Sequence, residues 1–193
     1  MSTKINNGIF HRGYFETEHI KVFRVKIGDP LLRCFLNLQL CKSDIEEVEG
    51  CSKRSWQETL EASCLASRKY LWVSFIKGCD KPCGVFGVAC EEEDRGLGIP
   101  WLLSDGEAQK KYPKECQRTA KAFMAFIQRE NGKFYALANI SGAPINSQGH
   151  RWLKSLGFKF DLHSPLFFSR SKGKPYYVFT KNCRKMKEEI NNV

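Results

Sequence analysis

The apolar positions along this chain change their spacing from one stretch to the next, and each spacing predicts an element. From Tyr70 to Ile76 and from Pro82 to Cys90 the residues are almost all apolar, with a short polar turn between the two runs. Such a pair of runs predicts an antiparallel hairpin. A third strand is expected from Gly96 to Ser104, where Pro100 is awkward in a central strand and indicates a bulge or an edge position.

A helical spacing follows this strand. Pro113 suits a first helical turn, and the apolar residues after it recur every three or four positions along one face: Cys116, Ala120, Phe123, Met124 and Ile127. The stretch from Lys133 to Phe158 then predicts a strand, a loop and a short helix. Asn146 or Ser147 can cap that helix, and Gly157 is suited to its left-handed end.

The first part of the chain and its end show weaker signals. Ser43 and Ser55 are each followed three residues later by Glu, which is the pattern of a capping box at a helix start. Residues 1–19 show no clear period and are expected to form a loosely attached arm. Residues 182–193 are polar and are expected to form a tail, so the predicted domain runs from 20 to 181.

Taken in order, the chain predicts a strand from His19 to Ile27, helices, three antiparallel strands, a helix, a strand, a helix and two final strands. This order predicts a mixed α/β (α+β) fold, in which a central, mostly antiparallel sheet of six to seven strands carries helices on both faces. The strand–helix–strand unit from Trp101 to Ala138 is expected to be a parallel crossover.

Composition narrows the class of protein. The net charge of +10 permits binding to nucleic acid or to phosphorylated cofactors, but the basic residues are spread out and match no nucleic-acid motif. No apolar run approaches ~20 residues, so no transmembrane helix is expected, and the first residues lack the apolar core of an export signal.

The nine cysteines are odd in number and include no C-x-x-C pair, so we expect reduced thiols and neither disulfides nor a metal site.

Three segments carry a family resemblance: GIPWLLSD from Gly98, YPKECQRTAKAFMAFI from Tyr112 and NSQGHRWLKSLGF from Asn146. Together they resemble a GNAT-like (GCN5-related N-acetyltransferase) family encoded by tailed phages, which includes internal virion proteins of short-tailed phages. The resemblance covers roughly residues 43–180 and implies the GNAT fold, with a splayed strand at Gly96–Ser104. It also implies acetyl-CoA as the cofactor if the protein is active, phage virion or host proteins as partners, and a location in the host cytoplasm during infection or in the virion interior.

The resemblance also implies where the cofactor would bind. In the family, the splayed strand, the loop before the long helix and the start of the last helix hold it, which here gives one set of residues: Leu102, Leu103, Lys110, Lys111, Lys114, Arg118 and Asn146. The loop normally has a Gln/Arg-x-x-Gly-x-Gly/Ala pattern, whose backbone amides bind the pyrophosphate. Here the glycines are absent from Lys110–Glu115, Pro113 lacks an amide hydrogen and Glu115 adds a negative charge. The side chains of Lys110, Lys111, Lys114 and Arg118 could replace the pyrophosphate-binding amides only in part, because they act as point charges.

Catalytic candidates are fewer. Many GNAT enzymes place a Tyr general acid on the last helix, but the matching residue here is Leu153, which cannot donate a proton. His150 is the alternative acid, and Glu93, in the acidic run before the splayed strand, is the candidate base. Each also has a simpler explanation, since His150 can be hydrogen-bonded near a helix start and Glu93 can belong to a solvated loop.

Two functions therefore remain open. The first is a phage-encoded GNAT-fold protein with a degenerate acetyl-CoA site, used as a virion-associated or host-interacting component. The second is an active acetyl-CoA-dependent N-acetyltransferase that acts on a protein or small-molecule amine. The absent glycines and Leu153 favour the first, whereas the fold resemblance alone favours the second. A nucleic-acid-binding module rests only on net charge.

Overall fold

The computed structural model describes the following parts of the chain: residues 13–30, 38–51, 54–67, 70–90, 96–129, 136–141, 147–160, 167–168 and 175–183. The strands in these parts are β1 (Tyr14–Glu16), β2 (Ile20–Arg24), β3 (Leu71–Ile76), β4 (Pro82–Cys90), β5 (Leu97–Ser104), β6 (Ala136–Ser141), β7 (Lys159–Phe160), β8 (Phe167–Phe168) and β9 (Pro175–Asn182). The helices are α2 (Lys42–Cys51), α3 (Trp56–Ser67), α4 (Glu107–Lys111), α5 (Pro113–Arg129) and α6 (Gln148–Ser155).

The strands form one sheet in the order β1-β2-β3-β4-β5-β6-β9-β7, and β8 pairs with β9 beside this path. All neighbours pair antiparallel except β5 and β6, which are parallel. The mixed, mostly antiparallel sheet and its parallel crossover confirm the predicted fold class. The described residues form nine strands, more than the expected six to seven, because β1 and β8 have only three and two residues and show no period of their own.

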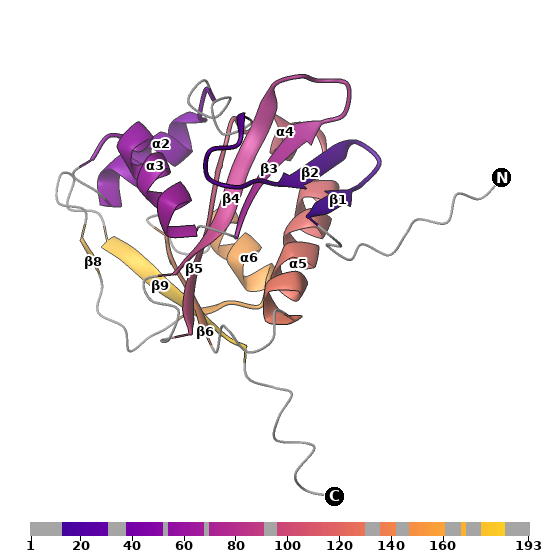
Figure 1. The fold of residues 1–193 in the computed structure, drawn as a ribbon. Coiled ribbons are helices and arrows are strands. Elements are labelled where there is room, and N and C mark those ends of the chain that lie inside the picture. Colours follow the sequence, from indigo (N-terminus) through magenta and orange to yellow (C-terminus); the bar gives the residue numbers. More distant parts are fainter. Residues whose placement is uncertain are drawn as a thin grey trace, which may run out of the picture.

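Helices cover both faces of the sheet, as predicted. Figure 1 shows α2 and α3 on one side and α5 and α6 on the other. Alternate strand residues supply the two cores, since successive side chains point to opposite faces. On the α5 and α6 face, Trp72 and Phe86 pack in one core with Phe123. On the α2 and α3 face, Leu71 and Val85 are buried with Leu60 and Leu103. Burial on both faces explains the nearly continuous apolar runs of β3 and β4.

Several end signals read from the sequence are confirmed. The backbone N–H of Ser55 donates to the Glu58 carboxylate at 2.8 Å, and the backbone N–H of Glu58 donates to Ser55 Oγ at 3.3 Å, which completes the capping box of α3. The Ser147 hydroxyl accepts a hydrogen bond from the backbone N–H of His150 and caps α6. Gly157, at φ 88°, ends α6 in the left-handed region.

Part of the predicted N-terminal arm forms a strand. Within the predicted loose arm, Tyr14 pairs with Phe23 and Glu16 with Lys21, so that β1 extends the sheet beyond β2. The described part of the chain contains no helix with both the length and the apolarity that crossing a bilayer requires. The cysteines whose side chains are described are free thiols: Cys41, Cys64, Cys79, Cys83, Cys90, Cys116 and Cys183.

Candidate functional site

The centre of the sheet contains a fork between β5 and β6. Among the residues that the structure describes, these two strands pair only at Leu97–Ala136 and at Gly98–Leu137. Beyond this point β5 continues to pair with β4 as far as Ser104, and β6 continues to pair with β9 as far as Ser141. The strands therefore part from each other while each remains held by its other neighbour. We call this divergence the β5–β6 fork.

Pro100 stands at the point where the strands part. Its carbonyl accepts a hydrogen bond from the Asn139 side-chain amide of β6 at 2.8 Å, so the Pro100 backbone faces β6. Proline has no N–H and cannot donate to a neighbouring strand. Pro100 thus occupies the edge-like position that the sequence indicated, although this edge lies in the middle of the sheet. The Asn139 side chain bridges the two strands where the backbone ladder has ended.

Leu102 is the next residue of β5 whose backbone faces the fork. In an antiparallel ladder, the residues of one strand alternate between bonding their neighbour and facing away from it. Asp105 donates its N–H to Cys83 of β4, and Ser104 donates its N–H away from β4, to the Asp44 carboxylate. The backbone of Leu102 therefore points into the fork, and its side chain is 37% exposed. No described strand pairs with Leu102 on this side.

Leu103 lies differently from Leu102. Its backbone pairs with Val85 of β4, and its side chain is buried in the core beneath α2 and α3. The sequence proposed both leucines as cofactor-binding residues, and the structure brings only Leu102 to the fork.

Ser104, the last residue of β5, makes hydrogen bonds to α2 and α4 that the sequence did not predict. The backbone N–H of Cys41 donates to the Ser104 carbonyl at 2.9 Å. The Asp44 carboxylate accepts the backbone N–H of Ser104 at 2.9 Å, and the Gln109 side-chain amide donates to the Ser104 hydroxyl at 2.9 Å. The start of α2 and the short helix α4 are thereby fixed to the strand that borders the fork. Asp44 bonds a residue 60 positions away in the sequence, and no local pattern predicts such a partner.

The segment that the resemblance assigns to the pyrophosphate, Lys110–Glu115, is divided between the end of α4 and the first turn of α5. Asp105 Oδ1 accepts the backbone N–H of Glu107 at 2.8 Å and so occupies the start of α4. Burial raises the pKa of the Asp105 carboxyl, and this hydrogen bond opposes the rise. The backbone N–H of Lys110 donates to the Gly106 carbonyl, and that of Tyr112 donates to the Ala108 carbonyl. These amides are therefore hydrogen-bonded within a short helical turn.

The predicted basic residues divide into two groups. Lys110 and Lys111 lie 3.3 and 3.5 Å from the Glu107 carboxylate, which offsets their charge in part. Lys114 and Arg118 are exposed, stand one turn apart at the start of α5 and form no ion pair with another described residue. At about 100° per residue they fall opposite the apolar side that Phe123 defines. They are therefore two exposed positive charges on the solvent side of α5 with no counter-ion among the described residues.

His150, the candidate acid, is buried at 4% exposure between α6 and β9. Its ring meets those of Phe179 and Tyr177 edge-on, at centroid distances of 4.8 and 5.5 Å. Leu153 is buried in the same core, so the matching position on α6 supports packing. The candidate base Glu93 and the proposed ligand Asn146 lie outside the described residues.

The bridge from Asn139 to Pro100 gives a first testable prediction. Replacing Asn139 with leucine or with aspartate removes the donor and leaves the Pro100 carbonyl without it. We expect each variant to lose about 1–2 kcal/mol of unfolding free energy, as for other part-buried hydrogen bonds. Urea denaturation measures the loss. Unchanged midpoints in both variants would show that the bond does not hold the fork together.

The comparisons with known proteins agree with this geometry. The sequence matches no family model, and no curated protein matches it. Solved structures are nevertheless similar in fold. The ribosomal-protein-S5-alanine acetyltransferase from Vibrio fischeri has a TM-score of 0.64 at 17% identity, covering 90% of this chain and 98% of its own. A GNAT-family acetyltransferase from Bacillus anthracis has a TM-score of 0.58 at 10% identity, covering 89% of this chain and 99% of its own.

A third similar structure contains a bound cofactor. It is a ribosomal-protein alpha-N-acetyltransferase in complex with coenzyme A, with a TM-score of 0.57 at 10% identity, and the match covers 86% of this chain and 95% of that one. At these identities the likeness concerns the fold. Together with the strand order and the β5–β6 fork, it shows that the chain has the fold of the GNAT acetyltransferases.

Proposed function

We propose that this protein is an acetyl-CoA-dependent N-acetyltransferase. The observation that carries the proposal is the β5–β6 fork, where the backbone N–H and C=O of Leu102 face away from β4 with no described strand opposite them. A strand edge inside a sheet can receive an extended ligand through its main chain. The similar structure in complex with coenzyme A has the same fold and supports this choice of cofactor.

The described residues suit one part of acetyl-CoA better than another. At the fork, Leu102 offers a backbone donor, a backbone acceptor and a half-exposed apolar side chain. At the phosphate end, Lys114 and Arg118 offer positive charge, whereas the nearby amides are largely used within α4. We therefore expect the phosphates to bind mainly through side-chain cations, which act as point charges.

Acetyl-CoA supplies the acetyl group as an activated thioester. The chain itself must orient the acceptor amine and stabilise charge on the carbonyl oxygen, and a backbone N–H such as that of Leu102 is a suitable donor for this purpose. Leu153 cannot donate a proton, and His150 is enclosed by aromatic rings. Proton transfer through these two side chains is therefore not part of the proposal.

The names of the similar structures support a protein amine as the acceptor. Two of them are described as acetyltransferases of ribosomal-protein alanine or of a ribosomal-protein alpha amine. We propose the α-amine of a protein as the first substrate class to test, with a small-molecule amine as the alternative.

A second candidate function is a GNAT-fold scaffold without catalysis, as expected for a phage-encoded, virion-associated or host-interacting component. The capped helix α4 favours it, because Asp105 and the turn carbonyls occupy amides that a pyrophosphate would need. Its partners would be virion or host proteins, in the host cytoplasm or in the virion interior. The resemblance found in the sequence supports this candidate.

Thermal unfolding with acetyl-CoA separates the two candidates. A ligand that binds only the native state stabilises it by about 2.7 kcal/mol at 100 times its Kd. For the acetyltransferase we expect a clear rise of the Tm at millimolar acetyl-CoA, reduced in a Lys114→Glu/Arg118→Glu variant.

The matched control is Lys121→Glu/Arg129→Glu, which makes the same change of charge at exposed positions further along α5. It should keep the rise of the Tm. An unchanged Tm in the unmodified protein would contradict the acetyltransferase and support the scaffold.

A further inference from the structure

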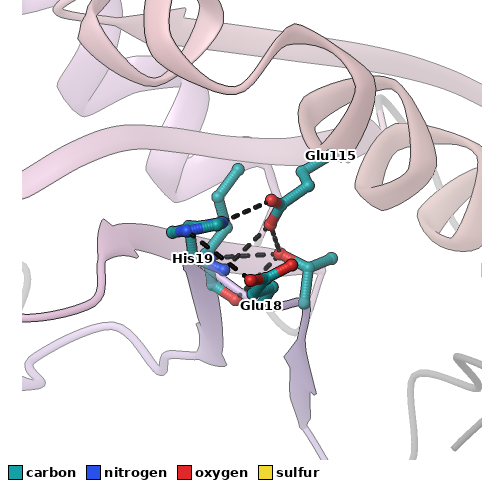
Figure 2. Close-up of polar contacts among 5 residues, drawn as sticks. Glu18, His19 and Glu115 are labelled. Carbon is teal, nitrogen blue, oxygen red and sulfur yellow. Dashed lines mark hydrogen bonds and ion pairs between the residues drawn. The ribbon is translucent and has the colours of Figure 1, made fainter. Parts of the chain in front are cut away.

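A polar cluster joins the start of α5 to the turn between β1 and β2, away from the fork. Figure 2 shows Glu115 reaching from its helix toward His19 and Glu18. The Glu115 carboxylate accepts the hydroxyl of Thr17, the backbone N–H of His19 at 2.9 Å and the ring of His19, whose Nδ1 lies 2.7 Å away. In the sheet, β3 and β4 separate β2 from the β5–β6 fork, although Glu115 itself directly follows Lys114 of the proposed phosphate-binding residues.

The hydrogen bonds of Glu115 determine which nitrogen of His19 carries the proton. The Thr17 hydroxyl and the backbone N–H of His19 both donate to Oε2 of Glu115, so this carboxylate acts as the acceptor of the cluster. An ionised carboxylate accepts and does not donate. The proton of a neutral His19 ring therefore lies on Nδ1, an assignment that follows from the hydrogen-bond network. The lone pair of Nε2 is left on the opposite side.

The orientation of the His19 ring is also fixed by stacking. Tyr112 stacks on it with a centroid distance of 4.4 Å and an interplanar angle of 10°. The imidazole is thus oriented by Glu115 at one nitrogen and by Tyr112 on one face. A histidine that binds a metal is commonly oriented in this way, by a carboxylate on the nitrogen that does not bind the ion.

We propose that Nε2 of His19 and the carboxylate of Glu18 bind a divalent transition-metal ion of the Zn²⁺ class. His19 Nε2 and Glu18 Oε1 are 3.9 Å apart, a few tenths of an ångström more than two ligands of a tetrahedral zinc ion with bonds of about 2.0–2.2 Å, and the exposed Glu18 side chain can close this difference. One ligand atom from each of Glu18, His19 and Glu115 lies within 4.8 Å of the others. Imidazole with carboxylate suits zinc, whereas an all-oxygen set would suit Mg²⁺ or Ca²⁺.

The environment of the two ligands favours an open site. The side chains of His19 and Glu18 are 41% and 83% exposed, so an ion reaches them directly from solvent. Two protein ligands leave two positions of a tetrahedral ion for water or for an anion. Glu115 does not bind the ion in this arrangement and acts as a positioning residue through the ring of His19.

The test is a Zn²⁺ titration followed by ¹⁵N-edited NMR of the imidazole rings, with the cysteines kept reduced. We expect the Nε2 signal of His19 to shift while its Nδ1 remains protonated. The readout is local to this ring, so zinc bound by thiols elsewhere does not mimic it. Glu18→Gln removes a ligand and should weaken the shift at least ~10-fold. Glu115→Gln should weaken it by about 10–100-fold, the usual effect of losing such a partner.

Glu49→Gln is the matched control, because Glu49 is an exposed carboxylate on α2. It should bind Zn²⁺ like the unmodified protein. Since Glu18 is largely exposed, its variant should fold normally even if Glu115→Gln loosens the β1–β2 turn. An unshifted Nε2 signal in excess Zn²⁺, or unchanged affinity in Glu18→Gln, would overturn the proposal.

Discussion

Replacing Trp72 with alanine is expected to lower the free energy of unfolding by about 3–5 kcal/mol, the usual cost of truncating a large buried aromatic residue. Trp72 is fully buried. Its ring meets Phe123 and Phe126 of α5 edge-on, at centroid distances of 4.9 and 5.6 Å, and stacks on Phe86 of β4 at 6.2 Å. The variant would leave a cavity at the point where α5 is held to the sheet. Urea denaturation of both proteins measures the difference.

Leu65→Ala is the control for this experiment. Leu65 is 60% exposed on α3, and substitutions at such positions usually change stability by less than about 0.5 kcal/mol. Equal losses in the two variants would mean that the aromatic cluster around Trp72 contributes no more than an exposed side chain. A loss confined to Trp72→Ala would show that this cluster stabilises the packing of α5 on the sheet.

Gly87→Ala is expected to be the second most damaging change, with a loss of about 1–3 kcal/mol or more from overpacking. A Cβ at Gly87 would lie 2.6 Å from the Tyr70 carbonyl oxygen and 2.9 Å from Ser67 Oγ. The first contact is with backbone in the adjoining turn, which cannot rotate away. Strand β4 therefore needs a residue without a side chain at this position.

Gly84→Ala provides the comparison. Its new Cβ would meet Ser74 Oγ at 2.8 Å, whereas the nearest backbone atom, the Leu103 carbonyl oxygen, is at 3.4 Å. Adding Ser74→Ala should therefore relieve most of the overpacking at Gly84. Adding Ser67→Ala to Gly87→Ala should not, because the Tyr70 carbonyl remains. Double-mutant cycles in urea compare the two couplings, and equal relief at both sites would contradict this explanation.

Much of the architecture follows from local patterns in the sequence. The hairpin of β3 and β4 was predicted within one residue at each end, because both strands are buried on two faces and read as unbroken apolar runs. Helix α5 was predicted because Phe123, Met124 and Ile127 recur at helical spacing, and all three are buried. In these elements, the spacing of apolar residues along the sequence is enough to indicate which side chains are buried.

Elements and contacts that depend on distant partners were missed. Helix α4 has five residues and no apolar period, and it is held by Asp105 at its start and by Ser104 through Gln109. The cluster of Glu115 with His19 joins residues 96 positions apart. The sequence analysis interpreted Glu115 only as a negative charge unfavourable to phosphate. No residue near Glu115 in the sequence indicates that it contacts the turn between β1 and β2.

The candidate site was predicted in part for the same reason. The fork and Leu102 follow from the resemblance and from Pro100, which are local features of β5. The closure of β5 by Cys41 and Asp44 could not be predicted, since it depends on where α2 docks. Leu103 was named with Leu102 because both belong to the splayed strand that the resemblance implies, whereas the alternation of a strand places the two residues on opposite sides.

Pro100 has a consequence for how this protein behaves at high concentration. Wherever two strands separate, each exposes a row of backbone groups to which a segment of another molecule can add, and this is a common first step of aggregation. A proline on such a row interrupts it, since an incoming segment finds no donor there. The carbonyl of Pro100 is already taken by Asn139. The residue at which the strands separate thus makes the opening a poor template for self-assembly. The backbone N–H of Leu102, two residues further on, has no partner strand among the described residues.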